Sequence, residues 1–201
     1  MKTRITTIIC LSMILYAGRL FSQSSAGIVI GASTSSVKLS DFKNTAVMAA
    51  SGQGIKGFEG GVYAKLGAGP LYIKPMLLAG YQAGQLNINY QDGSMKHADF
   101  KDGKMQVPVL FGLRLFHLVG LEAGPVYNWM FGASENADGG LHLEQSGLGY
   151  WVGANVLLGA LQVGLAYQGL TNISSSPSTA TYKSPDELIL DISIRLSSSG
   201  K

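Results

Sequence analysis

The chain has 201 residues, of which 46% are apolar, 27 are glycine and only 13% are charged. Soluble domains carry about 25% charged residues, so this composition disfavours an ordinary soluble surface. The formal net charge is +3, and the sequence contains no basic run that would mark a nucleic-acid-binding protein.

Residues 1–22 are expected to form a secretory signal peptide, followed by a single β-barrel domain at 23–201. Lys2 and Arg4 precede an apolar run at 5–17, which is shorter than the about 20 residues that span a bilayer as a helix. Three of the 15 basic residues lie in this leader, and the remaining 12 would balance the 12 acidic residues. Cys10 would leave with the leader, so no thiol would remain for a disulfide, a metal site or a nucleophile.

Alternation of apolar and polar residues predicts strands throughout the rest of the chain. Glycine and proline mark the turns between several of them, as in the Gly67 to Pro70 segment. The predicted strands, in chain order, are 27–34, 58–66, 71–85, 105–115, 121–131, 148–158, 161–170 and 188–196.

The clearest pattern is a hairpin at 105–131, in which one face is apolar and the other carries glycine, amide and charged residues. Arg114 and Glu122 fall on the polar face across a short turn, and we expect them to form an ion pair. Pro108 lies inside the first strand of the hairpin. Because proline cannot donate to a ladder, it predicts a local bulge there.

The connections alternate between long and short. Outer-membrane barrels have this asymmetry, with short periplasmic turns and longer outer loops. The sequence therefore predicts an all-β fold, an eight-stranded antiparallel up-and-down transmembrane β-barrel. The long loops are expected at 40–56, 87–104, 132–146 and 171–187, and the tight turns near 68, 118 and 160.

Charged residues on the predicted strands all fall on the face that would line the lumen. A barrel of eight strands fills its interior with side chains, and buried charges must be paired. We therefore expect a structural plug of ion pairs, with a polar ligand site or a narrow ion path as alternatives. The predicted lumen network consists of Glu59, Lys65, Lys74, Arg114, Glu122, Asp191 and Arg195.

Aromatic residues near the strand ends are candidates for the girdles that lie at the two membrane interfaces. They are Phe58, Tyr81, Tyr127, Trp129, Phe131, Tyr150 and Tyr167.

No catalytic, cofactor-binding or metal-ligating set emerges from the sequence. Three glycines in 52–57 have the spacing GxGxxG, but they lead into a strand rather than a helix and so do not predict a phosphate cradle. His97 and His117 have no partner at metal-site spacing. His142, Glu144 and Ser146 would suit a lipid hydrolase at the outer rim only with a geometry that the sequence does not fix. We expect that the protein is not an enzyme and binds no cofactor.

Three segments resemble the PorT-like group of outer-membrane β-barrel proteins: MQVPVLFGLRLF, LEAGPVYNWMFG and YQGLTNIS. The shared features are a Val-Pro in the fourth strand, an Ala-Gly-Pro in the fifth and a Tyr-x-Gly-Leu-x-Asn-Ile pattern after the seventh. This resemblance implies a small monomeric barrel with an architecture like that of OmpA, in the outer membrane of a Gram-negative bacterium and without catalysis. The name-giving member is associated with a protein secretion system.

Three functions from different classes remain open. The first is a non-enzymatic barrel exported to the cell outer membrane, where it contacts lipid and supports the envelope or binds other envelope or secretion-system proteins. The second is a small pore or transporter. The third is a soluble lipocalin-like carrier, in which the apolar face would point inward around a hydrophobic ligand.

Overall fold

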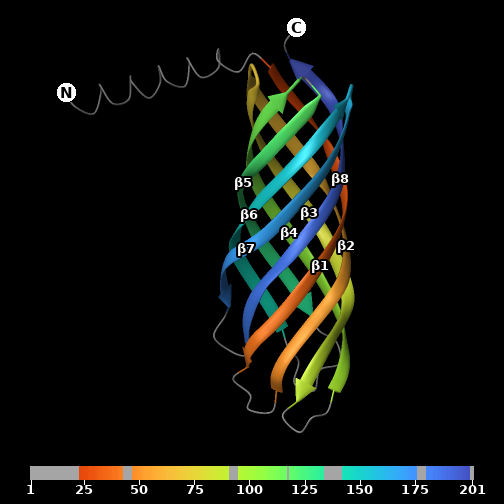
Figure 1. The fold of residues 1–201 in the computed structure, drawn as a ribbon, viewed down its shortest axis with the longest axis vertical. Helices are drawn as coiled ribbons and strands as arrows, with labels where there is room; N and C mark the ends of the chain where they lie inside the picture. Colours follow the sequence, from red (N-terminus) through yellow and green to blue (C-terminus); the bar gives the residue numbers. More distant parts are fainter. Residues whose placement is uncertain are drawn as a thin grey trace, which may run out of the picture.

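The computed structural model describes residues 23–42, 47–90, 95–116, 118–133, 142–175 and 180–199. They form eight antiparallel strands that pair in sequence order and close into a barrel through the pairing of the first strand with the last (Figure 1). This confirms the predicted fold class. The strands are β1 (Gln23–Phe42), β2 (Val47–Ala68), β3 (Leu71–Tyr90), β4 (Met95–Leu115), β5 (Val119–Ala133), β6 (His142–Leu158), β7 (Leu161–Ser175) and β8 (Ala180–Ser199).

Among the described residues, no helix is long and apolar enough to cross a membrane. The predicted leader at 1–22 lies outside the described residues.

One end of the barrel, here called the turn end, holds the tight connections predicted near 68, 118 and 160. Gly69 and Gly159 have positive φ values of 62° and 70°, which glycine adopts without strain and which suit tight hairpins. Phe116 occupies the corresponding turn between β4 and β5 with φ 49° although it is not glycine. Gln23 pairs opposite Gly67, so the described chain begins at the same end.

The opposite end, here called the loop end, differs from the prediction. The expected loops at 40–56 and 87–104 are largely strand, because β1 and β2 stay paired as far as Leu39 and Ala50, and β3 and β4 as far as Asn89 and Met95. The segments at 132–146 and 171–187 are also shortened by strand pairing. A polar segment carries no hydrophobic alternation, so the sequence signal for a strand is lost although the main chain continues to pair. Figure 1 shows β1 to β4 reaching furthest at this end.

The GxGxxG glycines lie within β2, in extended backbone rather than before a helix. Pro108 also stays within its strand: it pairs opposite Val126, and the same register continues to Phe111 opposite Ala123. The predicted bulge at Pro108 is therefore wrong, because the strand accommodates the missing donor without an inserted residue.

The apolar face of every strand points away from the barrel axis. Phe58, Val152 and Leu165, for example, are 65%, 51% and 53% exposed. The polar face points inward, and Glu59 and Lys74 are only 4% and 2% exposed. A soluble lipocalin-like carrier requires the opposite orientation, so that alternative is wrong.

Candidate functional site: the barrel interior

The structure places the predicted lumen network on the inner face, at different depths. Five of its side chains are buried, one is half-buried and one is exposed at the turn end. The buried side chains are Glu59, Lys65, Lys74, Glu122 and Asp191; Arg114 is half-buried, and Arg195 is exposed.

Towards the turn end, Glu122 is the main acceptor. Its carboxylate lies 3.2 Å from the Lys74 Nζ, and the Tyr72 hydroxyl donates to its Oε1 at 2.9 Å. The predicted pair between Arg114 and Glu122 is wrong. The register sets Gly112 opposite Glu122 and places Arg114 two residues nearer the turn, opposite Gly120.

A second ionic cluster lies towards the loop end. The Lys104 Nζ lies 2.5 Å from a carboxylate oxygen of Glu187 and 3.1 Å from one of Glu59. The Gln82 side chain donates to the same Glu187 oxygen at 2.9 Å. All four side chains are buried.

The sequence analysis missed Lys104 and Glu187, because both fall in segments that were assigned to loops. A usable signal was present. Lys104 has the same parity as the inward Gln106, and Glu187 the same parity as Asp191. Extending the alternation by one step at each strand end would have found both residues.

Three amide side chains form a layer next to the loop-end cluster. The Gln106 Nε2 donates to the Asn128 Oδ1 at 2.6 Å and to the Gln168 Oε1 at 3.2 Å, and the Gln168 Nε2 donates to the Asn128 Oδ1 at 3.1 Å. These bonds connect β4, β5 and β7 across the interior. Because each amide is almost fully buried, the network holds three walls of the barrel together.

Between the two ends, the interior is apolar. Along β3, for example, Met76 and Leu78 separate Lys74 from Gln82, and they are 5% and 1% exposed. The sequence analysis predicted a charge network for the lumen and did not predict that inward apolar residues gather at one depth. This apolar waist consists of Val29, Tyr63, Met76, Leu78, Leu110, Trp151, Ala166 and Ile189.

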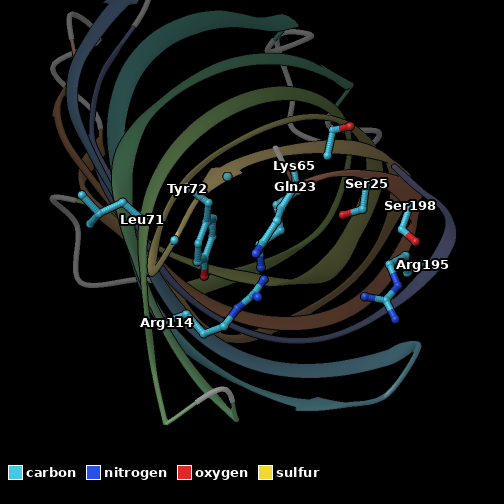
Figure 2. Close-up of a pocket in the computed structure, with 11 residues that line it drawn as sticks. Gln23, Ser25, Lys65, Leu71, Tyr72, Arg114, Arg195 and Ser198 are labelled. Carbon is cyan, nitrogen blue, oxygen red and sulfur yellow. The ribbon is translucent and has the colours of Figure 1, made fainter. Parts of the chain in front are cut away.

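At the turn end, the interior opens into a cavity of about 130 Å³. Its walls carry the cationic side chains of Lys65, Arg114 and Arg195. Figure 2 shows the ends of Lys65 and Arg114 converging on the same space, with Arg195 across the opening. The Arg195 Nη2 also donates to the Gly159 carbonyl at 3.2 Å.

Within the described part of the chain, no group of His, Cys, Asp and Glu side chains is arranged to hold a metal ion. His117 lies outside the described residues. His97 and His142 lie in β4 and β6, but their side chains, like that of Glu144 in the suggested rim set, lie outside the described part.

No protein-family model matches this sequence, and no curated protein is significantly similar to it. Among solved structures, the barrel is similar to Neisserial surface protein A, with a TM-score of 0.52 at 13% identity, covering 87% of this chain and 99% of that one. This likeness supports the fold alone, because the identity is so low.

Two other structures align over most of their length. The β domain of the Bordetella autotransporter BrkA has a TM-score of 0.37 at 13% identity and covers 86% of this chain and 100% of its own. The outer membrane protease OmpT from Escherichia coli has a TM-score of 0.40 at 8% identity and covers 88% of this chain and 97% of its own. Both scores are too low to support any argument about this chain.

Proposed function

We propose that the protein is a non-enzymatic integral β-barrel of the outer membrane of a Gram-negative bacterium. The observation that carries this proposal is the unbroken apolar belt around the outside of the barrel. A closed barrel satisfies all backbone hydrogen bonds between its strands, and only such a sheet is stable in the hydrocarbon region of a membrane.

The height of the belt fits a bilayer. Outward apolar side chains run from Leu71 to Tyr81 on β3 and from Leu148 to Leu158 on β6. A tilted membrane strand needs about 9–11 residues, which these stretches provide. In the described strands, exposed outer-face charges lie beyond the belt at the loop end, at Lys56, Lys101 and Asp186.

Aromatic rings mark one border of the belt. Tyr127 and Trp129 pack edge to face with ring centroids 4.5 Å apart, and Phe58 packs near Tyr81 at 6.0 Å. Of the predicted girdle residues, only Phe131 has a side chain outside the described part. Such rings favour the boundary between lipid and water. The turn-end border is built mainly from leucine, as at Leu158 and Leu196, with Phe116 in one turn.

In this placement, the short turns face the periplasm and the extended hairpins face outward. We propose that the interior clusters form a structural plug, and that the outer hairpins bind other envelope or secretion-system proteins. The PorT-like group is the family proposed for the chain, which is expected to act as a monomer. We further propose that 1–22 is removed as a leader and that 23–201 forms the mature barrel.

Heat-dependent gel mobility tests the membrane placement. Folded small barrels resist detergent, and we expect the protein to appear in the outer-membrane fraction and to change its apparent size on boiling. Recovery as a soluble periplasmic protein without a shift would contradict the proposal.

Planar bilayer recording tests the pore alternative separately. Because an apolar waist and buried ionic clusters lie in the described interior, we expect no steady single-channel conductance. Reproducible conductance steps from purified folded protein would favour a pore instead.

A further inference from the structure

The cavity at the turn end carries a surplus of positive charge. Its described lining contains Lys65, Arg114 and Arg195 and no acidic residue. It also contains the hydroxyl groups of Ser25 and Ser198, which lie on the same side of the opening as Arg195 in Figure 2. Side chains of this kind, gathered in one concave space, favour an anion.

The nearest interior carboxylates are already engaged deeper in the barrel. Glu122 accepts from both Lys74 and Tyr72. Asp191 accepts from the Ser193 hydroxyl at 3.3 Å. Neither carboxylate forms an ion pair with Lys65 or Arg114 within the described residues, so the cations at the mouth are not neutralised.

Arg114 is the least satisfied of these cations. Its Nε is buried and has no hydrogen-bond partner among the described residues. The Lys65 Nζ lies 3.6 Å from the centroid of the Tyr72 ring, which stabilises the ammonium on one side and leaves its other donors available. A buried donor without a partner is costly, and a bound acceptor would remove that cost.

We propose that this cavity binds a phosphate group. A guanidinium donates two parallel hydrogen bonds to one oxyanion, and an ammonium adds a point charge beside it. Free phosphate carries more than one negative charge at neutral pH and the phosphodiester of an anionic phospholipid carries one, and each offers several oxyanion acceptors to the three cations of the pocket. The cavity of about 130 Å³ accommodates a phosphate group with few waters.

The phosphate can come from two sources, free phosphate or the headgroup of an anionic phospholipid. The proposed membrane placement determines only from which side the phosphate would reach the cavity, and that side is the periplasm. A missing heat shift would refute the membrane placement without affecting the pocket, whereas the binding test below addresses the pocket alone.

The test uses the folded mature barrel in octyl glucoside, a detergent that contains no phosphate. Inorganic phosphate is titrated and followed by phosphorus NMR line broadening, and retained phosphatidylglycerol is measured by native mass spectrometry after passage through mixed lipid micelles. The variants are Arg114→Gln and Lys65→Gln. Lys56→Gln is the matched control, because Lys56 is an exposed lysine on the same strand as Lys65 but beyond the far border of the belt.

We expect Arg114→Gln to weaken phosphate binding about tenfold or more, which corresponds to the loss of a charge-assisted pair. Lys65→Gln should also weaken binding, and Lys56→Gln should bind like the wild type. Retention of phosphatidylglycerol that depends on Arg114, without binding of free phosphate, would support the pocket and identify the lipid as its source. Binding of neither ligand, or equal weakening by Lys56→Gln, would overturn the proposal. Each variant must keep the mobility of the folded wild type.

Discussion

The two ends of the barrel interior differ in how their charged side chains are paired. At the loop end, Lys104 lies between Glu59 and Glu187, and all three side chains are almost fully buried. At the turn end, Arg114 and Arg195 lie where the barrel opens and have no acidic partner among the described residues. The charges of the loop-end cluster, which are cut off from water, form ion pairs, whereas the cations that line the mouth have no acidic partner among the described residues, because desolvation is costly for an unpaired ion.

Removing the cation of the loop-end cluster should have the largest effect. Lys104→Met would leave two carboxylates buried without their shared partner, and breaking a buried ion pair costs about 3–5 kcal/mol. Urea unfolding in phospholipid vesicles should show that the free energy of unfolding falls by this amount. Lys101→Met is the matched control, since Lys101 is an exposed lysine on the same strand and should change stability little. Equal small losses for both variants would mean that the cluster does not stabilise the fold.

A smaller loss of unfolding free energy is expected at Gly112, whose backbone lies close to the Tyr72 ring towards the turn end. A Cβ added at Gly112 would lie 2.1 Å from the Tyr72 ring, so Gly112→Ala must displace the tyrosine that donates to Glu122. Overpacking of this kind costs about 1–3 kcal/mol. Gly60→Ala is the control, because its Cβ would meet nothing closer than 3.6 Å. Unchanged unfolding of Gly112→Ala would show that the ring moves freely and that its bond to Glu122 is dispensable.

The smallest effect is expected at the mouth. Arg114→Leu should change the unfolding free energy by less than about 1 kcal/mol, because Glu122 keeps Lys74 and Tyr72 and only a half-buried charge is lost. The same vesicle titration measures it. A loss as large as that of Lys104→Met would restore the pair between Arg114 and Glu122 that the sequence predicted.

The sequence predicted the barrel because a period-two pattern, such as Leu148 to Leu158 on β6, reports directly which face meets an apolar environment. It predicted individual inward charges for the same reason. It did not predict their partners, because the pairing of Lys74 with Glu122 depends on the strand register and the side-chain reach across the lumen. The apolar waist was missed because Met76 and Leu78 share a face with Lys74, and a single strand does not show that neighbouring strands contribute the same kind of residue at that depth.

The most direct test of the inside-out arrangement uses the two tryptophans of the chain. Trp129 is 41% exposed on the outer face, and Trp151 is 3% exposed inside the barrel. The fluorescence of Trp151→Phe, which keeps Trp129, should be strongly quenched in vesicles of lipid brominated near the headgroup. The fluorescence of Trp129→Phe, which keeps Trp151, should be almost unaffected. Strong quenching of Trp151 together with protection of Trp129 would contradict the account.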